Sequence, residues 1–162
     1  MCYNAGVKFL VDANVGRLAR WLRVAGFDTV FMNDVDDNRL VRAALSEDRV
    51  LLTRDSGILE RRVAVSGRLK VILVQDEDVR VQLRQVVRSL ALAGQFRPFS
   101  RCAECNEPLV RVDRSAVEDL VPSHVFKTQE QFMQCPACRR VYWRGTHWEK
   151  MRRELEEIAG GA

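Results

Sequence analysis

The sequence lacks any apolar run that approaches the roughly 18 residues needed to cross a lipid bilayer. Its N-terminus also lacks the charged, apolar and small-residue regions that together make a secretory signal peptide. These two absences exclude a membrane-spanning protein and a membrane partner, and they predict a cytoplasmic location. The sequence is not that of a disordered chain either, because 47% of its residues are hydrophobic and 30% are charged.

Lysine is scarce in this chain. Arginine supplies 22 of the 26 basic residues, and the formal net charge at pH 7 is only +4. The planar guanidinium group of arginine suits the recognition of phosphate and guanine. An excess of arginine over lysine also follows from genome composition, so the charge permits a nucleic-acid partner without indicating one.

Five cysteines are more informative than the charge. Cys102 and Cys105 form one C-x-x-C pair, Cys135 and Cys138 form a second, and Cys2 is left over. In a chain without an export signal, two such pairs predict a tetrahedral zinc site with four thiolate ligands rather than disulfides. Because all four positions are taken by cysteine, no position remains for water, and the predicted zinc is structural.

Residues 1–94 alternate between segments typical of strands and of helices. Strands are predicted at residues 8–11, 28–32, 49–53 and 70–74, and helices at residues 15–25, 37–46, 57–65 and 78–93. This alternation predicts an α/β fold whose parallel sheet is flanked by helices on both faces. Right-handed crossovers place the carboxyl ends of all strands at one edge, where open α/β sheets bind ligands.

The composition changes near Gly94, which predicts two domains. The first is the α/β domain over residues 1–94, whose first helix Gly26 is suited to close. The second covers residues 95–162 and contains the four-cysteine zinc ribbon and a C-terminal helix.

Aspartates follow three of the predicted strands. The first strand leads to Asp12, the third to Asp55, and the second to Asp34, Asp36 and Asp37. Carboxylates that converge at one edge repel one another unless a cation or a raised pKa relieves the repulsion. Oxygen ligands favour Mg²⁺ or Mn²⁺, the ions that support phosphodiester hydrolysis. An alternative stays open for Asp12 and Asp55, because aspartate is also a favoured N-cap of a following helix.

Three stretches resemble a known family in their order and spacing. They are FLVDANVGRLARWLRVAGFDTVF, DDNRLVRAALSEDRVLLTRDSGIL and CPACRRVYWRGTHWEKM. They are similar to the ribonuclease family named for the C-terminal domain of the Mut-seven exonuclease, and the similarity covers residues 7–153. The resemblance implies a PIN-like nuclease domain followed by a zinc ribbon, which cleaves single-stranded RNA with a divalent metal held by acidic residues.

The resemblance also implies roles for individual residues. Asp12 matches the first PIN carboxylate, Asp37 matches the aspartate of a motif continued by Leu40 and Ala44, and Asp55 matches the acidic position of the T-R-D segment. Full PIN domains carry a further acidic residue on a helix between the first and second of these positions. That segment is short here, so Asp34 and Asp36 both remain as additional acidic residues that could compensate.

Arginines near the predicted edge are assigned to the substrate. Arg17 lies one turn into the first predicted helix, and Arg54 stands beside Asp55, where it can pair with a carboxylate or a phosphate. Arg20 is assigned to the substrate as well, although a solvated helix face explains it equally well. Arg23 is assigned to that solvated face.

The zinc ribbon offers a second surface for RNA. After Cys138 the chain interleaves basic and aromatic residues, namely Arg139, Arg140, Arg144, Tyr142, Trp143 and Trp148. Single-stranded nucleic acid needs charge for its backbone and rings for its bases. The same rings can instead fill the small core of a ribbon, and His147 fits a surface position, a helix cap or a contact with the nuclease edge.

The sequence therefore predicts a divalent-metal-dependent ribonuclease that hydrolyses single-stranded RNA, with a structural zinc ion and catalytic Mg²⁺ or Mn²⁺. The alternative is a non-catalytic RNA-binding or ribosome-associated zinc-ribbon protein, in which the aspartates only cap helices. The two predictions differ in whether Asp12, Asp37 and Asp55 converge.

Overall fold

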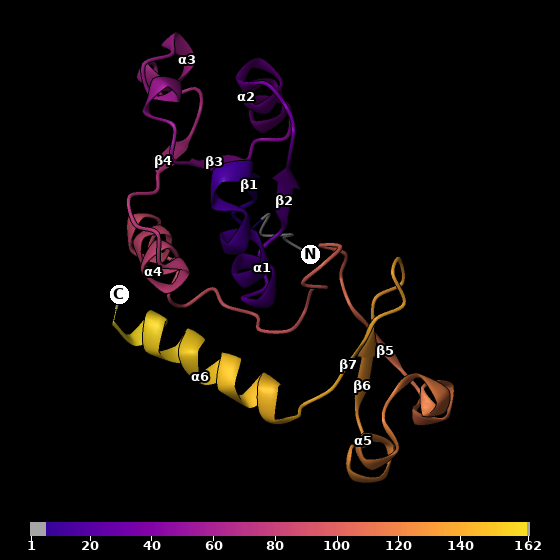
Figure 1. Cartoon of the computed structure of the whole chain (residues 1–162). Coiled ribbons are helices and arrows are strands. Elements are labelled where there is room, and N and C mark those ends of the chain that lie inside the picture. The colour runs from indigo at the N-terminus through magenta and orange to yellow at the C-terminus, as the bar shows by residue number, and fades with distance from the viewer. Residues whose placement is uncertain (1–5, 162) are drawn as a thin grey trace, which may run out of the picture.

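A computed structural model describes residues 6–161 of the chain. Its N-terminal part is an α/β unit with a four-stranded parallel sheet in the order β2-β1-β3-β4 (Figure 1). The elements are β1 (Phe9–Asp12), α1 (Gly16–Val24), β2 (Thr29–Met32), α2 (Asp37–Ser46), β3 (Val50–Thr53), α3 (Arg62–Val65), β4 (Val71–Leu73) and α4 (Val79–Ser89). The predicted α/β fold with a parallel sheet is confirmed.

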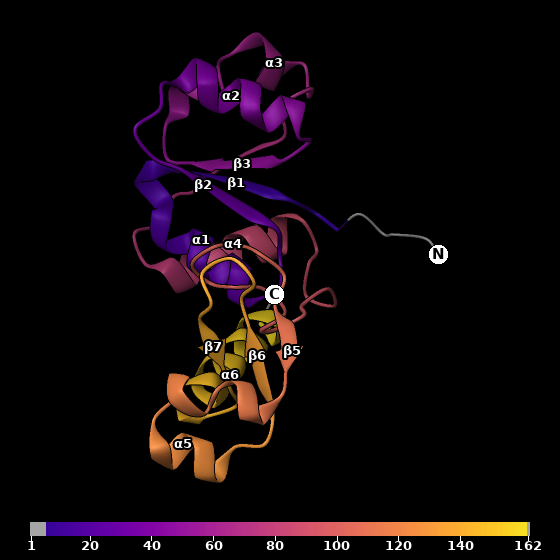
Figure 2. The ribbon, with the colours of Figure 1, turned by 90° about the vertical axis from the view of Figure 1, so that its right-hand side faces the viewer.

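Helices cover both faces of the sheet (Figure 2). Phe9 and Val11 of β1 and Leu52 of β3 point toward α1 and α4 and are fully buried there. Leu10 and Leu51, one residue out of phase, point to the opposite face and pack against α2. Strands buried on both faces must be apolar at every position, which explains why these segments read as continuous hydrophobic runs.

Two helix ends follow from backbone conformation. Gly26 closes α1 as predicted, because its φ of +100° lets Phe27 donate back to the carbonyl of Leu22. A Cβ at Gly26 would lie 2.4 Å from the carbonyl oxygen of Arg97, so the chain that crosses here also requires glycine. α4 ends at Ser89, four residues earlier than the predicted 93, because Ala91 adopts a φ of +52° and Leu92 donates to Val87.

The predicted helix at 57–65 is divided in the structure. A 3₁₀ turn covers Ser56–Ile58, and α3 begins only at Arg62. Asp55 starts the first of these pieces by accepting a hydrogen bond from the backbone of Gly57. The break gives the segment after β3 the shape of a loop with two short turns rather than a single helix.

The C-terminal part contains a three-stranded antiparallel sheet in the order β5-β6-β7. Its elements are β5 (Val110–Val112), α5 (Ser123–Thr128), β6 (Phe132–Gln134), β7 (Val141–Tyr142) and α6 (Thr146–Gly160). A small separate core of Val117, Val121, Val125 and Phe132, with Trp143 packed against it, supports this lobe. Trp143 thus contributes to ribbon packing, one of the two interpretations left open by the sequence.

The last helix returns from the ribbon to the α/β unit. α6 runs beneath α1 and alongside α4 (Figure 1), and its Met151, Leu155 and Ile158 belong to the same buried core as β1 and α1. The helix that was predicted as part of the second domain therefore shares the hydrophobic core of the first. Within the described residues, no helix has the length and apolar character required to traverse a bilayer.

Candidate metal centre and carboxylate edge

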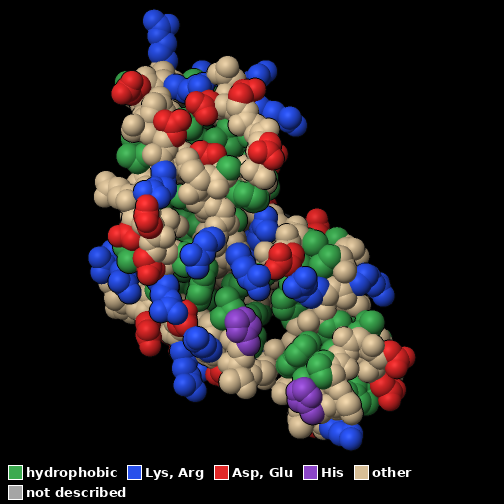
Figure 3. All heavy atoms as spheres, viewed as in Figure 1, with side chains coloured by type: hydrophobic (Ala, Val, Ile, Leu, Met, Phe, Trp, Pro, Cys, Tyr) green, Lys and Arg blue, Asp and Glu red, His purple; other side chains and the backbone are tan. Residues whose placement is uncertain are grey.

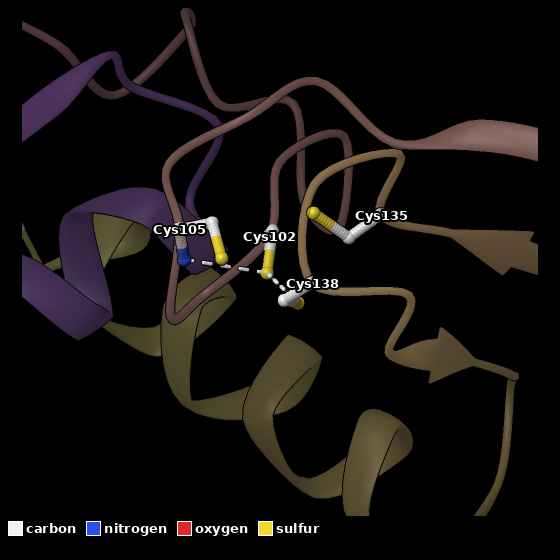
Figure 4. Close-up of side chains that lie close together, drawn as sticks. All are labelled: Cys102, Cys105, Cys135 and Cys138. Carbon is white, nitrogen blue, oxygen red and sulfur yellow. Dashed lines mark hydrogen bonds between the residues drawn. The ribbon is translucent and has the colours of Figure 1, made fainter.

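The four predicted zinc ligands meet at one point (Figure 4). The sulfur atoms of Cys102, Cys105, Cys135 and Cys138 all lie within 4.8 Å of one another, and none is in a disulfide. The sulfurs of Cys102 and Cys138 are 3.7 Å apart. In a tetrahedral site with zinc–sulfur bonds of about 2.3 Å, neighbouring sulfurs are about 3.8 Å apart. The four cysteines are therefore positioned to bind a metal ion and fit a structural zinc site.

Two turns of the same backbone design deliver these sulfurs. In the first, Asn106 donates to the carbonyl of Cys102 and has a φ of +68°. In the second, Arg139 donates to the carbonyl of Cys135 and has a φ of +67°. Each turn thus folds back at the residue after its second cysteine, which aims both sulfurs of the pair to the same side.

Hydrogen bonds bias the charge of the thiols. Burial disfavours ionisation of Cys102, but the Tyr142 hydroxyl and backbone N–H groups outweigh burial and lower its pKa to about 7. The contact with Cys138, followed by burial and the charge on Cys102, raises the pKa of Cys105 to about 12. Thiolates this close repel one another, and a bound dication removes that repulsion.

The first cysteine turn is anchored to the α/β unit. The Asn106 side chain accepts from the backbone N–H of Thr29 at 2.8 Å and donates to the Asp28 carboxylate at 2.8 Å. Arg23 donates to the carbonyls of Ala103 and Glu104. Arg23 is therefore half-buried and bonded to the cysteine turn rather than part of the solvated face predicted for it.

A buried arginine completes this anchor. Arg49 has a side chain only 9% exposed and pairs with Asp28 at 2.8 Å. Burial opposes ionisation of Asp28, but hydrogen bonds from Arg49 and Asn106 outweigh it and lower the pKa of this carboxyl below its usual value. The position of the cysteine turn is thus tied to the amino end of β2.

At the opposite, carboxyl edge of the sheet, two of the predicted acidic residues are connected through one hydroxyl group. Thr53 is fully buried, and its hydroxyl donates to Asp12 Oδ2 at 2.7 Å. The hydroxyl oxygen of Thr53 also accepts a hydrogen bond from the backbone N–H of Asp55 at 3.0 Å. This link exists because β1 and β3 are parallel neighbours in which Leu52 lies opposite Val11.

The place of this link in the sheet is significant. The chain passes from β1 outward to β2 and then returns to the other side of β1 to form β3. In open α/β sheets, ligands bind at the carboxyl ends of the strands where the winding direction changes. Asp12 and Asp55 flank this point.

Asp12 and Asp55 also act as helix caps. Asp12 accepts from the backbone of Ala13 at 2.7 Å, and Asp55 accepts from that of Gly57 at 2.8 Å. The capping role weighed for them in the sequence is therefore present. A carboxylate has about four lone-pair sites, so a cap leaves acceptor capacity on each residue.

The third predicted carboxylate, Asp37, begins α2 and lies 3.5 Å from Arg61 Nη2. Arg61 also donates to Asn38 at 2.8 Å, which ties the start of α2 to the segment after β3.

The two additional acidic residues lie in the turn before α2. Asp36 caps α2 by accepting a hydrogen bond from the backbone N–H of Arg39, and Asp34 adopts a φ of +53° in the preceding turn. Among the described residues, the four cysteines form the only group of at least three metal-ligating side chains whose ligand atoms lie within 4.8 Å of one another. The aspartates therefore do not form so compact a group.

The predicted arginines lie at different places. Arg17 is exposed in the first turn of α1, and Arg54 is exposed next to Asp55 with Glu77 3.6 Å from its guanidinium group. Arg20 lies farther along α1 and pairs with Glu104 of the first cysteine turn at 2.8 Å. Arg17 and Arg54 therefore belong to the carboxylate edge, whereas Arg20 faces the ribbon.

The sequence interpretation missed several polar residues at this edge. Thr53 was predicted only as the end of a strand. A hydroxyl group at the end of an otherwise apolar, buried strand indicates a polar partner nearby and could have identified it. Asn14 accepts from the backbone of Arg54 at 3.2 Å. Asp78, which follows β4, caps α4. Cys2, predicted to stay outside the zinc site, lies outside the described residues.

Comparison with known proteins identifies one family. The family model described as the Mut7-C RNAse domain matches residues 7–155 of the 162-residue chain. No curated protein and no solved structure matches the chain.

Proposed function

The chain belongs to the family of Mut7-C RNAse domains, and from this premise we propose that it is a divalent-metal-dependent ribonuclease that hydrolyses single-stranded RNA. The family indicates a ribonuclease-like function; the metal dependence and the single-stranded substrate are parts of the proposal. The four thiols also suit a reducing compartment such as the cytoplasm.

The observation that carries the proposal is the link through Thr53. Its hydroxyl joins Asp12 to the backbone of Asp55 at the point of the sheet edge where open α/β folds bind ligands. A buried hydroxyl that orients a carboxylate at such a point is typical of the support given to a metal-binding side chain. A residue that serves only as a helix cap does not need it.

In the proposed reaction, Asp12, Asp37 and Asp55 would hold Mg²⁺ or Mn²⁺ through their oxygen atoms, which are the ligands that hard dications prefer. When bound, such an ion supplies activation of water and stabilisation of the leaving oxygen in phosphodiester hydrolysis. Thr53 fixes the orientation of Asp12. Arg17 and Arg54, both exposed at this edge, bind the phosphates on either side of the cleaved bond.

The second candidate function is non-catalytic RNA binding, which is the alternative that the sequence also predicts. Two observations favour it. Each of Asp12 and Asp55 already caps a short 3₁₀ turn, and among the described residues Asp12, Asp37 and Asp55 do not come as close together as the four cysteines do. In that case the carboxylates organise the loops, and the ribbon alone contacts RNA.

Replacement of Asp55 separates the two functions. Asparagine caps a helix about as well as aspartate, so Asp55→Asn should leave the melting temperature nearly unchanged. A neutral amide is a poorer ligand for a hard dication. We therefore expect Mn²⁺-dependent cleavage of single-stranded RNA to fall by at least about a hundredfold, the order of effect seen when one stabilising group is removed from an active site.

The matched control is Asp48→Asn. Asp48 lies before β3, at the other edge of the sheet, is exposed, and has a φ of +50° that asparagine tolerates. This variant loses the same charge and should cleave RNA like the wild type. Cleavage by Asp55→Asn at the wild-type rate would reject the ribonuclease site and favour the RNA-binding function.

A further inference from the structure

A cavity of about 600 Å³ opens where distant segments of the chain meet. Most of its lining comes from α1, the stretch from Cys138 through β7, and the start of α6, and Phe99, Ala103 and Leu120 complete it. We call this cavity the ribbon groove. In the space-filling view, Lys and Arg side chains gather along the junction of the two lobes, next to exposed apolar side chains (Figure 3).

Apart from Cys138 of the cysteine cluster, the charged side chains that line the ribbon groove are all basic. Three arginines line it (Arg20, Arg139 and Arg140), together with His147, and its lining contains no aspartate or glutamate. The chain as a whole has 22 acidic residues, so their absence from these walls is selective. Glu104 stands nearby and pairs with Arg20 at 2.8 Å and with Arg140 at 3.8 Å. These pairs are exposed and therefore weak, so a phosphate group can replace the carboxylate.

Aromatic rings supply the remaining wall. Phe99, Tyr142, Trp143 and Trp148 line the groove, and the same four rings line a smaller cavity of about 280 Å³. That second cavity contains Arg111 and Arg144 and again no acidic residue. Guanidinium groups beside aromatic faces match a single nucleic-acid strand, which presents phosphates and unstacked bases together. Bases paired within an RNA duplex would not be free to reach such walls.

Helix α1 leads from the groove to the carboxylate edge. Arg20 lines the groove, Arg17 lies one turn earlier, and the helix begins at Gly16, directly after the turn that follows Asp12. Nine helical residues span about 13 Å.

We propose that the ribbon groove is the RNA-holding site of this protein, which binds the unpaired bases of a single strand whose backbone continues past Arg20 and Arg17 toward Asp12. Arg139 and Arg140 neutralise phosphates at the groove, and the aromatic walls contact the bases. The direction of the strand rests on the proposed ribonuclease function, because only that function places the cleaved bond at the carboxylate edge. The groove itself does not depend on it.

The test is binding of a short fluorescent oligouridylate without added divalent ions, measured over a range of salt concentrations. The double variant Arg139→Gln/Arg140→Gln should bind at least about tenfold more weakly. Each phosphate contact on a single strand contributes about 0.7 to the salt slope of log K, so the double variant should lose about 1.4. An oligomer of the same length without bases should bind the wild type at least about tenfold more weakly than oligouridylate.

The matched control is Arg42→Gln/Arg68→Gln, which removes two exposed arginines outside the groove. It should bind oligouridylate with the affinity and salt slope of the wild type. Zinc content and melting temperature establish that all variants fold. An equal loss of affinity in both double variants would overturn the assignment of RNA binding to the ribbon groove. Equal affinity of the wild type for the oligomers with and without bases would overturn it as well.

The outcome is separable from that of the cleavage experiment. If the Arg139→Gln/Arg140→Gln variant loses RNA binding while Asp55→Asn cleaves normally, RNA binding by the ribbon groove is supported and the proposed catalytic site is rejected. If this double variant binds and cleaves like the wild type while Asp55→Asn is inactive, the ribonuclease stands and the groove is rejected.

Discussion

The cysteine cluster and the carboxylate edge, which we propose as the catalytic metal site, bring their side chains together by different means. The cysteines come from two short turns of the same backbone design, and their sulfurs already have the spacing of a tetrahedral site. The aspartates come from the ends of parallel strands and the start of a helix, and each has a hydrogen-bond or ion-pair partner in the protein. Local turns can thus build a compact site, whereas the ends of parallel strands bring aspartates to one edge without forming so compact a set.

The two regions are also connected differently to the rest of the fold. The first cysteine turn is bonded through Asn106 to Asp28 and Thr29 at the amino end of β2. The carboxylates lie at the opposite ends of the strands. Variants in one region should therefore affect stability and zinc, and variants in the other should affect cleavage.

Loss of a zinc ligand should have the largest effect. Cys102→Ser should lower the zinc content from about one ion per chain to nearly none, because the remaining three thiols cannot complete the tetrahedral site. Structural zinc contributes about 10–16 kcal/mol in small zinc-binding peptides, so the ribbon should unfold. Metal analysis and circular dichroism measure both results, with Cys2→Ser as the control that keeps its zinc. A full zinc content in Cys102→Ser would contradict the assignment.

The next effect should appear at the carboxylate edge. Thr53→Val removes the hydroxyl that holds Asp12 and leaves the N–H of Asp55 without its partner, which should cost about 1–3 kcal/mol of stability. Loss of a group that orients a metal ligand lowers activity by about 10–100-fold, so cleavage should fall within this range.

Thr29→Val makes the same chemical change at the other edge, where the hydroxyl of buried Thr29 donates to the carbonyl of Phe27. It should lose stability but keep its cleavage rate per folded molecule. Parallel losses of cleavage in the two variants would show that Thr53 acts only on stability.

Loss of the ion pair between Asp28 and Arg49 should reduce the stability of the fold by an amount that depends on pH. The pKa of Asp28 is lower in the folded protein than its ordinary value of 3.8. Its carboxylate therefore stabilises the fold fully above that value, and this contribution disappears as the pH falls through the lower folded-state pKa. Asp28→Asn should lose about 2 kcal/mol at neutral pH. Urea denaturation at several pH values should show this difference narrowing as the pH falls below 3.8; a constant difference would be inconsistent with it.

The smallest effect is expected at Asn106. Glycine at this position tolerates the φ of +68° and removes only the side chain that bonds Asp28 and Thr29. Asn106→Gly should keep its zinc and lose about 1 kcal/mol. Hydrogen exchange should increase at Thr29, whose N–H loses its acceptor, and not at Leu52 in the middle of the sheet. Unchanged exchange at Thr29 would show that the side chain does not anchor the turn.

Features that depend on neighbouring residues could be predicted from the sequence. The alternation of strands and helices, the closing of α1 by Gly26 and the two cysteine pairs all depend on short stretches of chain. They were predicted correctly, except that the predicted helix at 57–65 is divided in the structure. The end of α4 at Ser89 was not, because it depends on a positive φ at Ala91, a residue that ordinarily favours helix. The predicted parallel strands also place Asp12 and Asp55 at one edge of the sheet, where the Thr53 hydroxyl joins them in the structure.

Features that join distant residues were decided only by the tertiary structure. The bond between Thr53 and Asp12, the contact of Asn106 with Asp28, and the packing of α6 on α4 each connect segments separated by about forty residues or more. No local pattern encodes such a contact, because its energy is realised only when the register of the strands and the docking of the lobes bring the two groups together. The sequence by itself determined which residues are candidates for binding metal and phosphate, and the tertiary structure determined which of them face one another.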